Sequence, residues 1–189
     1  ANLSDKFPED RHVMWRRCRM WVVYQGRTRE FSLQTTDSFE KTPSGGIWKF
    51  KLPIGSGLFV NISVILSIVE NSNAVRMFVY REPIENQKHA ANDATPVKIV
   101  IRPDVEDRNF HFETKAYAGP EKEWPSLVSS DVKTMLFKPA KDREFLLRIS
   151  RGSFTALPEW TYSVFQKKEA ERGLEASSDI FSPGYFQFE

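Results

Sequence analysis

The sequence has little of the two residue types that most often build cross-links and metal sites. It contains one cysteine, Cys18, and three histidines among 189 residues. A single cysteine cannot form an internal disulfide, and the scattered histidines do not have the spacing of a structural zinc site. We therefore expect no disulfide framework, no metal and no cofactor. The scarcity of cysteine suits a reducing compartment, and we predict a cytoplasmic location.

Long apolar runs and an excess of one charge are also missing. No run approaches the roughly 18 residues that a membrane span needs, and the N-terminus lacks the basic-then-apolar pattern of a signal peptide. The 27 Lys and Arg residues nearly balance the 25 Asp and Glu residues, leaving a net charge of +2. Such a weak field does not favour nucleic acid or an anionic membrane surface. We expect a soluble protein that binds neither nucleic acid nor membrane.

The chain does have the length and apolar content of one sizeable core. A chain of 189 residues with 40% hydrophobic residues is typical of a single domain. The sequence begins without Met and ends in an aromatic, strand-like run at residues 185–189. We therefore expect one domain over residues 1–189 that has been cut from a longer protein.

Period-two patterns dominate the sequence and predict strands. The clearest covers residues 58–68, where six apolar residues alternate with a more polar face. Further strands are predicted at residues 13–24, 29–33, 48–52, 75–79, 97–102, 109–113, 132–137, 144–150 and 185–189, with residues 25–27 as a hairpin connection between the first two. Residues 35–46, 82–96 and 117–130 have the composition of loops, and only residues 164–172 have a helical pattern, closed by Gly173. Strands without intervening long helices predict a mainly β chain, an antiparallel β-sandwich with one short helix near the C-terminus.

The segment of residues 97–114 concentrates many of the unusual residues of the chain. Its first half alternates apolar and basic residues until Pro103, which cannot donate to a strand ladder. The acidic residues that follow are typical of a turn, and Phe110 and Phe112 then alternate with polar residues. These patterns predict a β-hairpin with its turn near Asp104 and Asp107.

Two motifs of this sequence resemble one known family. The first is Arg102-Pro103, four residues, Arg108, one residue and Phe110-His111, with Thr114 after it; the second comprises Glu169, Glu171, Arg172, Gly173, Leu174, Asp179, Phe181, Pro183, Gly184, Tyr185 and Phe186. Together they resemble the N-terminal domain of bacterial and archaeal glycogen debranching enzymes of the amylo-α-1,6-glucosidase type. The resemblance implies a supersandwich-like β-domain that precedes an (α/α)6-barrel catalytic domain.

The resemblance also implies a function. The chain is expected to brace the catalytic barrel of the same polypeptide and to contribute to α-glucan binding in glycogen and starch metabolism. The catalytic carboxylates of the family lie in the barrel, so this chain alone is expected to be no enzyme. A free-standing carbohydrate-binding module and a protein-interaction β-sandwich remain as alternatives.

The residues themselves nominate no catalytic set. A glycosidase needs two facing carboxyl groups, and none of the 25 acidic residues is singled out by its spacing. Sugar binding asks for an aromatic ring beside planar polar groups. Trp15 and Trp21 share a strand face with two arginines, and Trp124 lies in a predicted loop. These three are candidate contacts for substrate or a neighbouring domain, although packing in a core is the commoner role of tryptophan.

Arg108 and His111 complete the set of candidates for substrate binding or a domain interface. Arg108 shares its predicted strand face with Phe110 and Phe112, and a charged group there must be paired or reach a polar crevice. We expect an ion pair with an acid such as Asp104 or Asp107. His111 lies on the opposite predicted face, where it is either a surface residue or a contact with a neighbouring domain.

Overall fold

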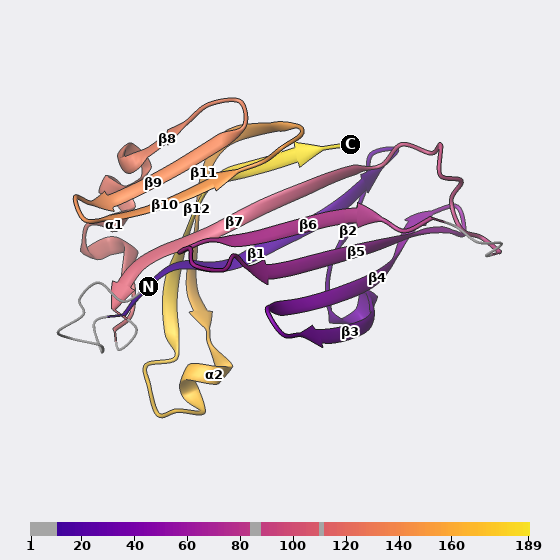
Figure 1. Cartoon of the computed structure of the whole chain (residues 1–189). Coiled ribbons are helices and arrows are strands. Elements are labelled where there is room, and N and C mark those ends of the chain that lie inside the picture. The colour runs from indigo at the N-terminus through magenta and orange to yellow at the C-terminus, as the bar shows by residue number, and fades with distance from the viewer. Residues whose placement is uncertain (1–10, 84–87, 110–111) are drawn as a thin grey trace. The chain divides into compact units, whose positions relative to one another are not determined.

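The computed structural model describes residues 11–83, 88–109 and 112–189 (Figure 1). The strands are β1 His12–Tyr24, β2 Arg27–Glu30, β3 Thr36–Thr42, β4 Gly45–Gly55, β5 Leu58–Ile68, β6 Val75–Arg81, β7 Lys98–Asn109, β8 Val128–Ser130, β9 Thr134–Ala140, β10 Arg143–Arg148, β11 Ser153–Phe165 and β12 Ser177–Phe188. The helices are α1 Pro120–Glu123 and α2 Lys167–Ala170, and 3-10 turns cover Leu33–Thr35, Ala116–Ala118 and Trp124–Leu127.

The strands form three sheets. Their orders are β11-β12-β7-β1-β2, β10-β9-β8 and β3-β4-β5-β6, and consecutive strands such as β4 and β5 pair antiparallel. The predicted mainly β fold of antiparallel sheets with a short helix near the C-terminus is confirmed. Each α-helix in the described part of the chain has four residues, far fewer than a helix needs to cross a membrane.

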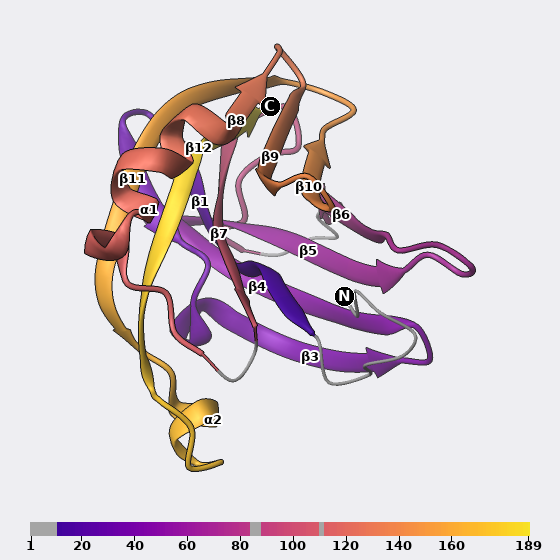
Figure 2. The ribbon, with the colours of Figure 1, turned by 90° about the vertical axis from the view of Figure 1, so that its left-hand side faces the viewer.

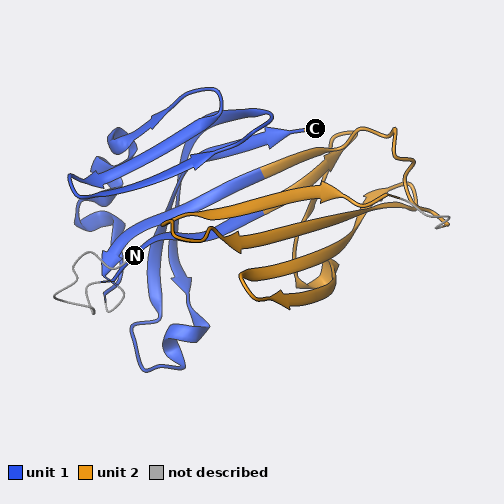
Figure 3. Ribbon diagram, viewed as in Figure 1, with its two compact units in different colours: residues 1–19, 101–188 blue, residues 20–100, 189 orange. Residues whose placement is uncertain are grey.

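The chain forms two compact units (Figure 3). Unit 1 comprises residues 1–19 and 101–188, and unit 2 comprises residues 20–100 with residue 189. Both β1 and β7 continue from one unit into the other. We describe the interior of each unit by itself, because the units differ in what they bury.

Unit 2 buries a stripe of aliphatic side chains. Its four-stranded sheet runs β3-β4-β5-β6, and Figure 2 shows β3, β4 and β5 side by side. Val60, Ile62 and Val64 of β5 are buried, as the alternation of residues 58–68 predicts. Burial of each such side chain is worth about 1.5 to 3 kcal/mol before conformational entropy is subtracted. The stripe therefore accounts for why β5 lies between β4 and β6 rather than at an edge.

Unit 1 buries aromatic rings beside its sheet. Trp124 lies 5.2 Å from Phe137 and 5.4 Å from Trp160 between ring centroids. Phe181 of β12 completes the cluster at 5.1 Å from Trp160. The predicted loop of residues 117–130 therefore carries a core residue, and it contains α1, two 3-10 turns and the short strand β8.

The predicted hairpin at residues 97–114 is wrong, because β7 is one continuous strand from Lys98 to Asn109. Pro103 lies within the strand, and its carbonyl accepts a hydrogen bond from Ser182 Oγ at 3.0 Å. The acidic residues read as a turn are instead ladder residues whose side chains have cationic partners. Phe112 to Thr114, the described end of the predicted return strand, are not in a strand, and Phe110 lies outside the described residues.

Three other expectations need correction. Residues 36–42, predicted as loop, form the mostly exposed edge strand β3, whose polar composition conceals its pairing with β4. Residues 153–163, with no predicted element, belong to edge strand β11, in which two register shifts break the alternation. The helix predicted from residue 164 begins only at Lys167, because Val164 and Phe165 pair with Ser178 and Ser177 of β12.

Candidate functional site: an ion network along β7

One face of β7 carries four ionisable side chains in succession. Arg102, Asp104, Glu106 and Arg108 are spaced by two, so they share a face of the strand. All four are buried, and Glu106 is 0% exposed. Transfer of an unpaired charge into a protein interior is very costly, so each group must have a charged or polar partner.

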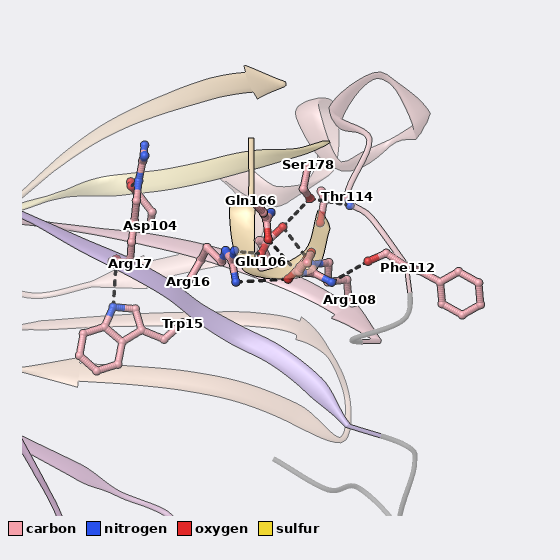
Figure 4. Close-up of polar contacts among 11 residues, drawn as sticks. Trp15, Arg16, Arg17, Asp104, Glu106, Arg108, Phe112, Thr114, Gln166 and Ser178 are labelled. Carbon is pink, nitrogen blue, oxygen red and sulfur yellow. Dashed lines mark hydrogen bonds and ion pairs between the residues drawn. The ribbon is translucent and has the colours of Figure 1, made fainter. Parts of the chain in front are cut away.

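Glu106 is the centre of the network in unit 1 (Figure 4). Its Oε1 accepts hydrogen bonds from Ser178 Oγ at 2.6 Å and from Arg108 Nε at 3.2 Å. Its Oε2 faces Arg16 Nε of β1 at 3.8 Å, but it makes no hydrogen bond with any described residue. Glu106 therefore links β7 to β1 and β12 by charge and hydrogen bonding.

Arg108 extends the network to the segments that follow β7 and β11. Its Nη1 donates to the carbonyl of Phe112 at 2.6 Å, and its Nη2 donates to Glu169 Oε1 of α2 at 2.7 Å. Arg16 approaches the same Glu169 oxygen at 3.4 Å. The expected ion pair of Arg108 exists, but its acids are Glu106 and Glu169 rather than Asp104 or Asp107.

Asp104 organises the other end of the face. Arg19 donates to both of its oxygens, at 3.0 and 2.8 Å, and Arg17 also binds it. Burial acts to lower the pKa of Arg19, but its hydrogen bonds and charge interactions with Asp104 and Glu159 raise it. Burial lowers the pKa of Arg102, which donates to the carbonyl of Leu157 at 2.7 Å. These arginines thus hold β1, β7 and β11 together.

Asp179 of β12 holds two backbone segments, one in β11 and one in the 3-10 turn at Ala116–Ala118, by accepting hydrogen bonds from their amides. Its Oδ1 accepts from the Ser163 amide at 2.8 Å, and its Oδ2 accepts from the Ala116 amide at 2.9 Å. The Thr114 amide donates to Ser178 Oγ at 2.9 Å, so the neighbouring residue of β12 anchors the same segment. One carboxylate therefore brings the backbone beside Tyr162 and the backbone beside Tyr117 close together.

The segments anchored in this way carry exposed aromatic rings, which we call the exposed aromatic surface. Its members are Phe112, Tyr117, Tyr162 and Phe165, which are exposed by 70%, 80%, 54% and 69%. Tyr162 donates its hydroxyl to Glu121, and this hydrogen bond, with a smaller contribution from desolvation, raises the pKa of Tyr162. Phe112 points away from the network in Figure 4.

The network is suited to positioning and not to glycosidic bond cleavage. A pair of catalytic carboxyl groups must be open to substrate, whereas Asp104, Glu106 and Asp179 are buried and hydrogen-bonded. No group of three or more His, Cys, Asp or Glu residues could hold a metal ion within the described ranges. The arrangement therefore supports segments of chain rather than chemistry.

The three tryptophans predicted as candidate contacts have different local surroundings. Trp15 donates its Nε1 to the carbonyl of Arg17 at 3.1 Å and stacks on Phe145. Trp21 is half-buried in unit 2, opposite Glu30 in the β1–β2 ladder. Trp124 is 6% exposed and lies in the aromatic core of unit 1. His111 lies outside the described residues.

Sequence reasoning missed most partners of Arg108. Glu106 falls in the predicted turn, and the other side-chain partners of Arg108, Gln166 and Glu169, come from distant segments. One pattern could have revealed β7: basic, acidic, acidic and basic residues alternate at spacing two from Arg102 to Arg108, as they do on one face of a strand. The partners on other strands leave no such local pattern.

Comparison with known proteins identifies the same family that the two sequence motifs resemble. The family described as glycogen debranching enzyme N terminal matches residues 1–189, the whole chain. No curated protein and no solved structure matches the chain. The chain belongs to the glycogen debranching enzyme N-terminal family.

Proposed function

We propose, from this family membership, that the chain is a non-catalytic domain that braces the catalytic domain of a glycogen debranching-type glucosidase. Residues 1–189 form one N-terminal domain of the longer polypeptide, and its partner is an (α/α)6 barrel with amylo-α-1,6-glucosidase activity. The domain also contributes to the binding of α-glucan. The observation that carries the proposal is the exposed aromatic surface of unit 1.

The surface has the composition of an interface core. Several exposed aromatic side chains on neighbouring backbone segments are unusual on a free domain and often mark sites of association. Phe112 and Phe165 have no polar group with which to bind solvent, yet both are more than two-thirds exposed. Their segments are held by Arg108, Glu169 and the β11–β12 ladder. A surface that is fixed in this way loses little conformational freedom when a neighbouring domain covers it.

The buried charges also favour a supporting role. Each carboxylate of the network is committed to arginine, serine or backbone partners, so none is placed to protonate a leaving group. We therefore expect the 189-residue chain to release no glucose from maltooligosaccharides or branched dextrins. Glucose release that is lost when one acid of this chain is changed would contradict that role.

The test compares the same substitutions in two settings. The paired change Phe112→Ser and Phe165→Ser should leave the melting temperature of the 189-residue chain nearly unchanged, because both rings face solvent there. In the full-length enzyme it should lower the melting temperature of the catalytic domain and its activity. Loss of two buried aromatic contacts is worth several kcal/mol, on the order of 3 to 5 per fully buried ring.

Phe78→Ser provides the matched control, because Phe78 of β6 is also about half exposed but lies in unit 2. It should have little effect in either setting. If the paired variant leaves the full-length enzyme unchanged, the surface does not brace the barrel. Binding of an unrelated protein to the surface would instead favour an interaction module.

A further inference from the structure

Unit 2 contains a cleft that the network does not use. It has a volume of about 600 Å³ and is lined by Tyr24, Gln25, Asn92, Ala94, Thr95 and Pro96. Sites for small ligands have volumes of about 300 to 1,000 Å³. The cleft is therefore large enough for one or two sugar rings.

The first wall is a tight hairpin turn. β1 ends at Tyr24, which pairs with Arg27 at the start of β2. Gln25 and Gly26 between them have φ angles of 47° and 74°. Positive φ at both central residues is the geometry of a type I′ turn, which matches the twist of the two strands. Tyr24 and Gln25 therefore stand at a fixed corner of the hairpin.

The second wall is a segment held by one arginine. Arg81 of β6 donates to the carbonyls of Ala91 and Thr95 at 2.6 Å and to the carbonyl of Asn92 at 2.7 Å. The Ala91 amide in turn donates to the Phe59 carbonyl of β5 at 2.8 Å. A guanidinium group fixes several acceptors at once because its donors lie in one plane. Residues 91–95 of the predicted loop at residues 82–96 are therefore held in one conformation by Arg81 and form one side of the cleft.

The chemistry of the lining selects for a neutral, hydroxyl-rich ligand. Its described residues offer one aromatic ring, two carboxamides and two hydroxyls, those of Tyr24 and Thr95, and none of them is charged. An aromatic ring stacks on the apolar face of a pyranose, and planar carboxamides bind neighbouring hydroxyls. Asn92 Oδ1 accepts from the Ala94 amide at 2.8 Å, which orients its Nδ2 as a donor. A phosphate or carboxylate ligand would find no cationic side chain among the lining residues.

We propose that this cleft binds a segment of an α-glucan chain, with Tyr24 stacked on one glucose ring and Gln25, Asn92 and Thr95 bonded to hydroxyls. This inference rests on the proposed binding of α-glucan, and it assigns that binding to the cleft in unit 2. It is independent of the exposed aromatic surface of unit 1. Arg81 is a positioning residue, because it shapes the wall through backbone carbonyls.

The experiment titrates the 189-residue chain with maltoheptaose and follows backbone amide NMR shifts together with calorimetric affinity. The amides of Gln25, Ala94 and Thr95 should shift. Tyr24→Ala should weaken binding about tenfold, the loss expected for one stacked ring. Thr95→Val, which removes one hydroxyl, should weaken it less. Tyr80→Ala is the matched control, because Tyr80 of β6 is exposed and does not line the cleft.

Each outcome decides between the alternatives. If the chain binds maltoheptaose but the three amides do not shift, the glucan site lies elsewhere and only the cleft is excluded. The amide shifts of the unmodified chain give this answer even if Tyr24→Ala does not fold. If the chain binds no maltoheptaose, both the cleft and the glucan-binding part of the proposed function fail, whereas bracing is tested separately on unit 1. Equal affinity for β-linked cellohexaose would contradict the commitment to α-glucan.

Discussion

Strands β5 and β7 both lie inside their sheets, but β7 buries a row of charged side chains on one face, whereas the buried row of β5 is aliphatic. β5 buries Val60, Ile62 and Val64 in unit 2, where any well-packed aliphatic neighbour is acceptable. β7 buries Arg102, Asp104, Glu106 and Arg108 on one face, where each group requires a particular partner. Apolar burial therefore supplies stability in unit 2, whereas the ion network of unit 1 specifies which segments meet, at a desolvation cost.

The largest effect should come from a charge in the β5 stripe. Ile62→Asp places a carboxylate where the side chain is 2% exposed, with no cationic partner among the stripe residues. The cost is about 4 kcal/mol or more, against a total stability of roughly 5 to 15 kcal/mol. We expect no cooperative melting transition by circular dichroism.

Ile68→Asp is the control for that variant, because Ile68 belongs to the same alternating set on β5 but is 65% exposed. It should fold and melt close to the parent chain. A soluble, cooperatively melting Ile62→Asp variant would show that the stripe is not the core of unit 2.

A smaller loss is expected from the β7 network. Arg108→Met leaves the Glu106 carboxylate buried without the positive charge of Arg108. Removal of one member of a buried ion pair lowers the free energy of unfolding by about 3 to 5 kcal/mol. Adding Glu106→Gln removes the uncompensated charge, so the two changes together should cost less than the sum of the single changes. Chemical denaturation of the parent, the two single variants and the double variant gives the coupling energy between Arg108 and Glu106.

Lys168→Ala provides the surface comparison for Arg108→Met. Lys168 pairs with Glu171 at 2.8 Å, but its side chain is largely exposed. An exposed ion pair contributes about 0 to 1 kcal/mol, so this variant should be nearly silent. If Arg108→Met is equally silent, the network does not hold unit 1 together.

The smallest effect concerns Cys18, which lies on β1 beside the network. Desolvation first, and then the charge of Asp104, raise its pKa to about 12. A raised folded pKa stabilises the folded state below the unfolded value of about 8.5, and this contribution is lost as pH rises toward 12. The effect is therefore small near neutral pH, whereas above about pH 9 stability should fall more steeply in the parent than in Cys18→Ala.

Thiol modification gives a direct reading of the same group. At pH 8 the Cys18 thiol should react slowly in the folded chain and quickly in denaturant, because only the thiolate is nucleophilic. Rapid modification of the folded chain would show that the Cys18 thiol is not desolvated, and would contradict the raised pKa.

The difference between β5 and β7 also explains what the sequence could predict. The sequence predicts a strand over residues 58–68, the bounds of β5, because apolar residues at every second position show the two-residue period of a strand. The sequence pattern predicts that the strand ends at Pro103, because charged residues that are buried in the fold have the composition of a turn when their partners are unknown. Arg16 and Ser178 become partners of Glu106, and Glu169 becomes a partner of Arg108, only through the fold, so local sequence patterns could not predict this site.

The exposed aromatic surface was hidden for a related reason. Phe112, Tyr117, Tyr162 and Phe165 are separated in sequence, and only Asp179 and the rest of β12 anchor their backbone segments beside one another. The sequence favours Trp15, Trp21 and Trp124 as candidate contacts instead, because tryptophan is rare and its ring is large. Composition indicates which side chains can bind, whereas exposure, which depends on tertiary packing, decides which of them are available.

The central claim, that unit 1 braces a catalytic domain, is tested most directly by amide hydrogen exchange. The exchange rates of residues 112–117 and 162–165 should be compared between the 189-residue chain and the full-length enzyme under one set of conditions. Coverage by the barrel should slow exchange in both segments of the full-length enzyme, while β3 of unit 2 serves as the internal reference. Equal exchange of the two segments in both proteins would contradict the account.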